Sequence, residues 1–296
     1  MNHGALAMMA VTVLALCGGC WNPPGPTARP VERGLVWMLP GVEGGPWSMY
    51  WARAAFRDAG VESEIRIFEW QRPFGALQNL TDYEGNRRKA AEVAEEIAGY
   101  RQGHPDGPID LVGYSGGGGL AIMVAEALPE SVHLRNVVLA QPALSPDYDL
   151  TAALSRIDGK LVNFYSPYDW LILGVGTRLF GTMDRREVAS AGKERFDLAR
   201  AVRDPALRDQ VEQRRWELRM VGDGHFAGHF GILSYWWNRR YVAPYLLSEC
   251  PTSPTRAERR AAAATEQSEC AARGQTRANL LLPLATRLRI LRVSWH

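Results

Sequence analysis

The chain has 296 residues, of which 46% are hydrophobic and 22% are charged, and its formal net charge is +2. This composition is ordinary for a soluble globular protein, and the length suffices for one large α/β domain with extensions. The small net charge predicts neither nucleic acid nor acidic substrates as partners.

The first twenty residues differ from the rest of the chain. Ala5–Leu16 is an apolar run that is too short to span a bilayer but suits the hydrophobic part of a secretory signal peptide. The run leads to Cys20, and the proline-rich residues 21–33 follow as an expected tether. This pattern resembles a bacterial lipoprotein signal over residues 1–20, which implies lipidation of Cys20 and a membrane anchor facing the periplasm or the cell exterior. Simple secretion and a cytoplasmic location remain as alternatives.

Apolar runs typical of strands alternate with helical patterns between residues 34 and 247. Strands are expected at 34–39, 61–70, 109–113, 136–140, 161–165 and 216–221. Helices are expected at 47–59, 82–100, 120–128, 150–156, 170–179, 187–203 and 235–247, and 71–80 is expected to be a loop. The alternation predicts an α/β protein with a single doubly wound, mainly parallel sheet and helices on both faces. Residues 251–277 are polar and rich in arginine and alanine, and Leu280–Val293 is apolar and basic. Together, residues 248–296 are expected to form a flexible basic tail.

The pattern Gly-x-Ser-x-Gly stands between the third expected strand and the helix that follows, with Ser115 at its centre. Small residues on either side let such a turn close around a strained serine, whose hydroxyl then points away from the sheet. Two alternatives remain. The serine could be idle on a glycine-rich turn. The run from Gly116 to Ala121 also fits a dinucleotide-binding pattern, although Gln141 ends the next strand where that pattern requires an acid.

A serine hydroxyl needs an imidazole to take its proton and a carboxylate to hold that imidazole. Asp169 follows the strand 161–165 and is the expected acid, with Asp147 and Asp149 in reserve. Two histidines lie in a glycine-rich loop after the last expected strand. His229 is preferred to His225 because the five residues from His229 to the final helix suit the return of the chain.

The four-residue spacing of His225 and His229 also raises the alternative of a metal site. The glycines around them disfavour a helix, and Phe226 occupies the place where a metalloprotease motif has its glutamate. No metal and no other cofactor is therefore expected.

With these motifs in chain order, residues 34–247 resemble an α/β-hydrolase fold serine hydrolase. The resemblance implies a triad of Ser115, Asp169 and His229 or His225, and an oxyanion hole formed by the amides of Gly116 and Val42. It also implies hydrolysis of a small-molecule carboxylic ester or related acyl substrate through an acyl-enzyme. An acyltransferase, a peptidase and a non-catalytic surface lipoprotein remain as alternatives.

Aromatic side chains stand near the expected strand ends, at Trp47, Trp51, Tyr168 and Trp170. They could line an apolar pocket for the acyl group of the substrate, in which case esters of small or medium apolar acids are favoured. Equally, they could be ordinary aromatic residues of the core.

Overall fold

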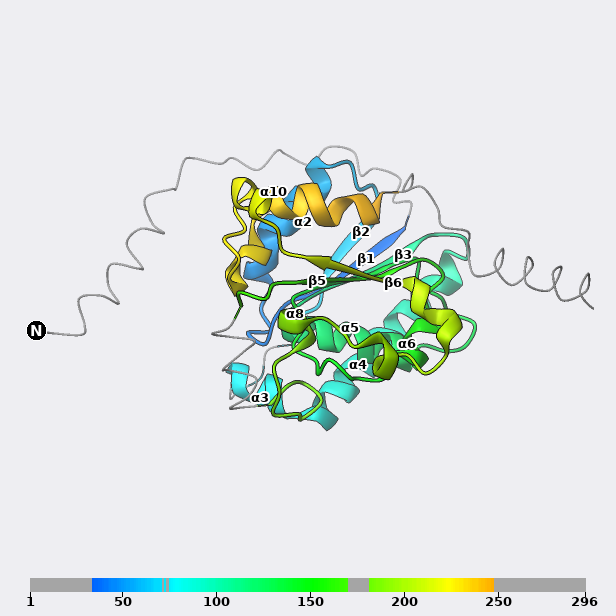
Figure 1. Ribbon diagram of the computed structural model, residues 1–296. Coiled ribbons are helices and arrows are strands. Elements are labelled where there is room, and N and C mark those ends of the chain that lie inside the picture. Colours follow the sequence, from blue (N-terminus) through cyan, green and yellow to red (C-terminus); the bar gives the residue numbers. More distant parts are fainter. Residues whose placement is uncertain (1–33, 71, 73–74, 170–180, 248–296) are drawn as a thin grey trace, which may run out of the picture. The chain divides into compact units, whose positions relative to one another are not determined.

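The computed structural model describes residues 34–70, 72, 75–169 and 181–247 (Figure 1). Its strands are β1 (Leu35–Leu39), β2 (Glu64–Ile67), β3 (Ile109–Tyr114), β4 (Val137–Ala140), β5 (Leu161–Tyr165) and β6 (Val211–Arg215). They form one sheet in the order β2-β1-β3-β4-β5-β6, and every neighbouring pair is parallel. The predicted doubly wound parallel sheet is confirmed. Parallel strands end at the same edge, so the loops after β1, β3 and β5 meet there.

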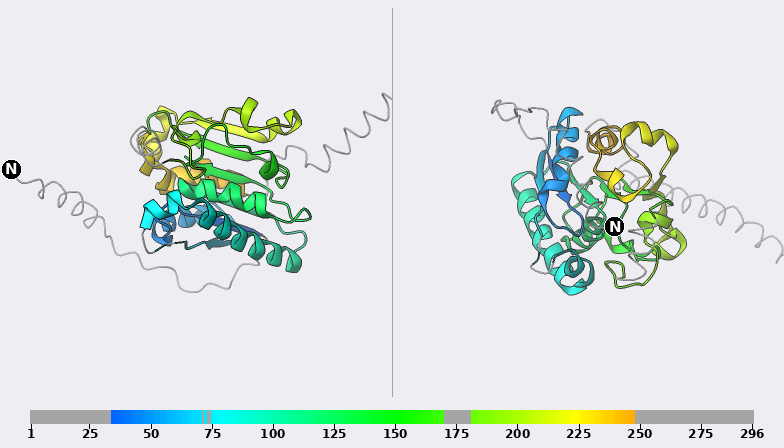
Figure 2. Two further views of the ribbon diagram at one scale, coloured as in Figure 1. Left: turned by 90° about the horizontal axis from the view of Figure 1, so that it is seen from below. Right: turned by 90° about the vertical axis from the view of Figure 1, so that its left-hand side faces the viewer.

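Helices cover both faces of the sheet (Figures 1 and 2). One face packs against α4 (Tyr83–Gly103), α5 (Gly116–Ala127), α6 (Thr151–Leu154) and α8 (Ala191–Glu194), and the other against α2 (Tyr50–Asp58) and α10 (Tyr235–Trp237). The side chains of β1 alternate between two cores: Leu35, Trp37 and Leu39 enter the core with α4 and α5, whereas Val36 and Met38 enter the core with α2 and α10. Burial on both faces explains why the central strands are continuous apolar runs in the sequence.

The remaining elements are short. They are α3 (Gly75–Thr81), α9 (Leu198–Ala201), the 3₁₀ helices Pro46–Met49, Pro205–Gln210, Leu218–Asp223, His229–Leu233 and Ala243–Leu246, and a π-helical turn over Asn238–Val242. The helix predicted at 235–247 thus starts as α10, continues as the π-helical turn and ends as the 3₁₀ helix Ala243–Leu246. In the described ranges, no helix is both long and apolar enough to cross a bilayer. Several predictions lie outside the described residues. They are the signal peptide at 1–20 with Cys20, the tether at 21–33, the helix at 170–179 with Trp170, and the tail at 248–296.

The last strand was predicted at the wrong place. Residues 216–221 belong mostly to the 3₁₀ helix Leu218–Asp223, and the strand is β6, which has the sequence Val-Glu-Gln-Arg-Arg. β6 is an edge strand, and charged side chains on an edge protect it from pairing with other chains. Because β6 is polar, a search for apolar runs did not identify it as a strand. The apolar residues at 216–221, which suggested a strand, include Met220, and this side chain is buried although it belongs to the 3₁₀ helix.

Three other predictions need correction. The expected loop at 71–80 contains most of α3, and the expected strand at 61–70 shortens to β2. The single helix predicted at 187–203 is two short helices, α8 and α9. Arg195 separates them with a left-handed φ of 73°, and the Asp197 carboxylate then caps α9 by accepting from the Ala199 amide. In contrast, the helix predicted at 82–100 is confirmed as α4, with Asp82 as its N-cap.

Candidate active site

Ser115 occupies the tight turn between β3 and α5. Its φ of 53° and ψ of −119° are strained for a residue with a side chain. The main chain holds this conformation, because the Ser115 amide donates to Ala140 O at 2.9 Å and the Ser115 carbonyl accepts from the amides of Gly118 and Ala143 at 2.9 and 3.0 Å. The Ser115 hydroxyl does not cap the helix. It is therefore available to other groups at the carboxyl edge of the sheet.

The structure brings His229 and Asp169 to this serine. His229 Nε2 lies 2.9 Å from Ser115 Oγ, and His229 Nδ1 lies 2.5 Å from Asp169 Oδ2. Because a carboxylate only accepts hydrogen bonds, the imidazole proton belongs on Nδ1, which leaves Nε2 to accept from the hydroxyl. The Asp169 side chain is 2% exposed and that of His229 is 12% exposed. The three groups thus form a chain of hydrogen bonds suited to removing a proton from the serine.

The loops that carry these two partners are tied together. Asp169 follows β5 after a short turn, in which its amide donates to Ser166 O. The Ser166 hydroxyl donates to Ala227 O at 2.5 Å, two residues before His229. This contact fixes the histidine loop to the exit of β5 and so sets the distance between the acid and the imidazole.

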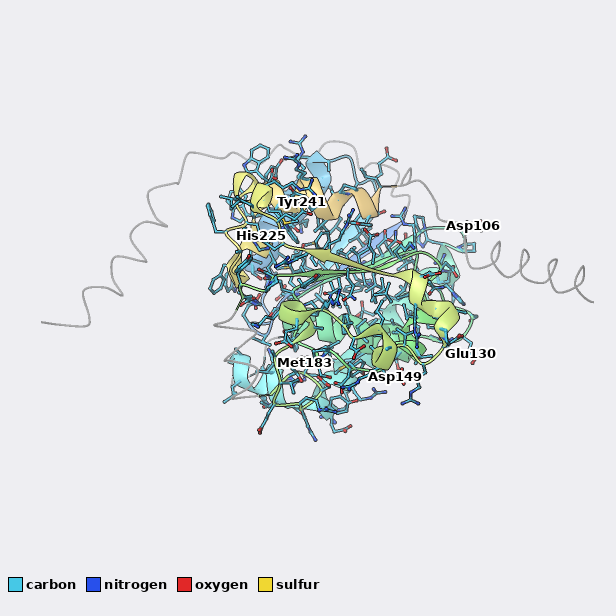
Figure 3. All side chains as sticks on the ribbon, viewed as in Figure 1. Asp106, Glu130, Asp149, Met183, His225 and Tyr241 are labelled. Carbon is cyan, nitrogen blue, oxygen red and sulfur yellow. The ribbon has the colours of Figure 1, made fainter. Side chains whose placement is uncertain are left out.

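The structure does not bring His225 to Ser115. His225 lies at the opposite end of the sheet from Asp106 and Glu130, near the carboxyl edge (Figure 3). It is 2% exposed, and its ring packs edge-on against Trp237 with 5.2 Å between the centroids. A Cβ built on Gly231 would lie 2.3 Å from His225 Nδ1, so the ring is held tightly by the loop of His229. His225 is therefore a buried support of that loop.

Burial lowers the pKa of His225 to about 4. In the unfolded chain a histidine binds its proton near pH 6.5, so between pH 6.5 and 4 the unfolded state carries a proton that the folded state lacks. We expect the free energy of unfolding to fall as the pH is lowered through this window, by about 3 kcal/mol from this group. His225→Gln should flatten the fall in urea-unfolding experiments at pH 7, 5.5 and 4.5. Parallel pH profiles for the two proteins would contradict this expectation.

The reserve acids are engaged elsewhere. Asp147 pairs with Arg186 at 3.3 Å, and Asp149 pairs with Arg203 at 3.0 Å and accepts from the Thr151 amide. Figure 3 shows Asp149 on the helical face of the sheet that carries α5 and α6, away from His225. The two imidazole nitrogens of His229 instead bond Asp169 and Ser115.

Two main-chain amides lie beside Ser115, those of Gly116 and Val42. A Cβ built on Gly116 would lie 3.3 Å from Val42 N, so the loop after β1 touches the first residue of α5. Neither amide donates a hydrogen bond within the described part of the chain. Two free donors next to a nucleophile can stabilise the negative oxygen of a tetrahedral intermediate, and the start of α5 adds its positive dipole end.

Asn79, which lies in α3 and so within the segment predicted to be a loop, holds the Val42 loop in place. Asn79 is fully buried, its Nδ2 donates to Val42 O at 2.7 Å, and its own carbonyl accepts from Asn86 Nδ2. Trp70 Nε1 donates to Pro40 O at 3.1 Å and supports the same loop. A buried asparagine within a polar segment gives no sequence signal of this role.

Asn79→Ala should lower kcat by about tenfold with little change in KM, because the Val42 amide loses its support without being removed. Steady-state kinetics on an activated ester would measure the effect. Thr81→Ala is the matched control, since the exposed Thr81 hydroxyl bonds only within α3, to Leu77 O. An equal loss in both variants would contradict a role for Asn79 in positioning Val42.

The glycine run at the start of α5 leaves no room for a dinucleotide. Every position from Gly116 to Gly119 is covered by protein atoms. A Cβ on Gly116 would meet the Val42 side chain, and one on Gly117 would meet Leu39 O. The next two glycines face Pro142 and Met183. The glycines thus serve close packing of α5, and the dinucleotide alternative is not supported. Across the described residues, no group of three histidine, cysteine or acidic side chains could hold a metal ion.

No protein-family model and no curated protein sequence matches the chain. Solved structures do resemble it. An uncharacterized protein from Bacillus cereus matches at 13% identity and a TM-score of 0.41, over 76% of this chain and 64% of its own. A predicted CIB-like hydrolase from Thermoplasma acidophilum matches at 15% identity and a TM-score of 0.42, over 73% and 87%. Aspergillus fumigatus lipase B matches at 12% identity and a TM-score of 0.45, over 73% and 54%. This chain therefore spans less than two thirds of the length of the Bacillus cereus protein and of the Aspergillus fumigatus lipase.

The strand order and the position of the serine in this chain identify its fold. The sheet is parallel, the serine stands on the turn from β3 to α5, and serine, aspartate and histidine follow in that order. The chain has the α/β-hydrolase fold.

In this α/β-hydrolase fold, a pocket of about 130 Å³ opens beside Ser115. Its lining residues are Gly41, Glu43, Trp47, Ser48, Tyr114, Ser115, His229, Phe230, Ile232 and Leu233. Of the aromatic residues considered either for a pocket or for the core, Trp47 lines this pocket, whereas Trp51 and Tyr168 are exposed and are not among its lining residues. Phe230 was missed, although it is the residue next to His229.

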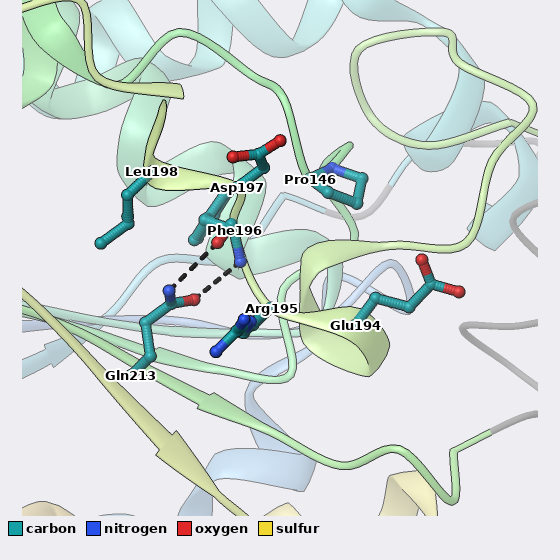
Figure 4. Close-up of a pocket in the computed structure, with 7 residues that line it drawn as sticks. All are labelled: Pro146, Glu194, Arg195, Phe196, Asp197, Leu198 and Gln213. Atoms are coloured by element: carbon teal, nitrogen blue, oxygen red, sulfur yellow. Dashed lines mark hydrogen bonds between the residues drawn. The ribbon is translucent and has the colours of Figure 1, made fainter. Parts of the chain in front are cut away.

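A larger hollow of about 640 Å³ lies elsewhere, between Pro146, Gln213 and residues 194–198 (Figure 4). The Gln213 side chain uses both of its polar atoms on the main chain of Phe196, accepting at 2.7 Å and donating at 3.1 Å. This hollow contains neither Ser115 nor His229. The small pocket is therefore the candidate substrate pocket.

Proposed function

We propose that this protein is a serine hydrolase that cleaves a carboxylic ester, or a related acyl compound, through an acyl-enzyme. The observation that carries the proposal is the hydrogen-bonded chain from Ser115 Oγ through His229 to Asp169. A strained serine at the start of a helix, a correctly oriented imidazole and two free amides supply the groups that acyl transfer requires.

The reaction follows from these positions. Ser115 Oγ attacks the carbonyl carbon while its proton passes to His229 Nε2, and the carbonyl oxygen becomes negative beside the amides of Val42 and Gly116. Asp169 stabilises the positive imidazolium. When the tetrahedral intermediate collapses, the alcohol leaves with the proton from Nε2. Water then attacks the acyl-enzyme by the same steps, the acid is released and the serine regains its proton.

A fluorophosphonate probe tests the proposal, because it reacts with activated serines. Labelling of the full-length protein at Ser115, identified by mass spectrometry, and hydrolysis of p-nitrophenyl butyrate are the expected results. Ser115→Ala should show neither. A folded wild-type protein that does not label would overturn the proposal and favour a non-catalytic protein on this fold. Faster turnover with an added alcohol acceptor would indicate an acyltransferase, and cleavage of peptides in preference to esters would indicate a peptidase.

We also propose that the protein is exported and anchored to a membrane through Cys20. The support is the apolar run before Cys20 and the proline-rich segment after it. Incorporation of labelled palmitate into the wild type but not into Cys20→Ser would be expected. An intact N-terminal methionine on the mature protein would overturn this proposal.

A further inference from the structure

An acidic side chain lies in the pocket beside the nucleophile. Glu43, in the loop after β1, lines the pocket together with Ser115 and His229. A Cβ built on Gly41 would lie 2.4 Å from Glu43 Oε2 and 3.5 Å from Ser115 Cβ. Gly41 therefore stands between the carboxylate and the serine, and its lack of a side chain is what allows them to lie so close.

The Glu43 carboxylate has a neutral partner. Its Oε1 accepts from the Ser48 hydroxyl at 2.5 Å, which fixes its orientation. The described residues that line the pocket include no lysine or arginine. The Ser48 hydroxyl is neutral, so among the described residues that line the pocket the charge of the Glu43 carboxylate is not balanced by a lysine or arginine.

This charge would oppose the reaction of a neutral ester. The adjacent residue, Val42, presents its amide to the site where the carbonyl oxygen becomes negative, and a carboxylate nearby raises the energy of that oxygen. A positive group on the substrate would offset the repulsion and would be attracted to Glu43. Trp47 and Phe230 line the same pocket with exposed aromatic rings, and ring faces attract alkylammonium groups.

We propose that Glu43 determines substrate specificity and selects acyl substrates that carry a compact alkylammonium group a few bonds from the scissile carbonyl. The inference rests on the proposed function of Ser115. Glu43 supplies the counter-charge, Ser48 orients it, and the aromatic rings of Trp47 and Phe230 provide the apolar side of the cation site.

A matched pair of esters tests this inference on the full-length protein. Butyrylcholine and 3,3-dimethylbutyl butyrate have nearly the same shape and differ in the positive charge. The wild type should prefer the cationic ester in kcat/KM by about tenfold or more, and Glu43→Gln should reduce this ratio by about tenfold. Glu95→Gln removes an equally negative, exposed side chain from α4 and should leave the ratio unchanged.

A second measurement does not depend on the folding of the variant. Tetramethylammonium should inhibit hydrolysis of 3,3-dimethylbutyl butyrate by the wild type competitively, since it occupies the cation site without an ester. Turnover of both esters without charge preference, or an unchanged ratio in folded Glu43→Gln, would overturn the role of Glu43 while the hydrolase function stands. Absence of fluorophosphonate labelling at Ser115 would instead overturn the proposed function, and this inference with it.

Discussion

Replacing His229 by alanine should lower kcat/KM for an activated ester by about 10⁴–10⁶ and should nearly stop labelling of Ser115 by a fluorophosphonate. The imidazole accepts the hydroxyl proton at Nε2, 2.9 Å from Ser115 Oγ, and it is held by Asp169 on the other side. Without it, the hydroxyl keeps its ordinary high pKa and is a weak nucleophile. Ester kinetics and the rate of labelling measure the loss, and circular dichroism checks the fold.

His225→Gln is the informative control for that experiment. Glutamine remains neutral and polar in the buried position, and the hydrogen bonds to Ser115 Oγ and Asp169 Oδ2 come from His229. Activity should stay within about tenfold of the wild type at pH 7, because only the packing under the histidine loop changes. A folded His225 variant that loses as much activity as His229→Ala would contradict the assignment of the two histidines.

The sequence predicts the features of the site that are local. The turn at Ser115 depends on its immediate neighbours, since only small residues let α5 approach β3 so closely, and a five-residue pattern contains this information. Asp169 was predicted because it follows an apolar strand directly. The choice between His225 and His229 is harder, because both stand in one loop. The three-dimensional structure distinguishes them: the His225 ring is buried, whereas the His229 nitrogens bond Ser115 and Asp169.

Features that depend on contacts between distant segments leave no local signal in the sequence. Asn79 supports Val42 from a separate helix, and nothing near either residue in the sequence shows the contact. Glu43 becomes notable only when the loop after β1 folds against the turn at Ser115. The edge strand β6 is polar because one of its sides is unpaired, so a criterion based on apolar alternation misplaced it.

Gly117→Ala should destabilise the protein by about 4 kcal/mol or more, which is the largest stability effect we expect from one methyl group. A Cβ at this position would lie 2.1 Å from Leu39 O and 2.3 Å from Pro40 O. These are main-chain atoms of the last residue of β1 and of the residue that follows it, and they cannot rotate away as a flexible side chain would. Urea unfolding at pH 7 measures the change.

Gly99→Ala provides the matched comparison, because Gly99 lies on the exposed side of α4 and a Cβ there would meet nothing within 4 Å. That variant should be more stable than the wild type by about 0.5–1 kcal/mol, since alanine favours the helix. Gly117→Ala should also lose activity even under conditions where it folds. The methyl group would push α5 away from the loop that follows β1, and this loop carries the Val42 amide. Retention of full stability and activity in Gly117→Ala would show that this loop can move without disturbing the turn at Ser115.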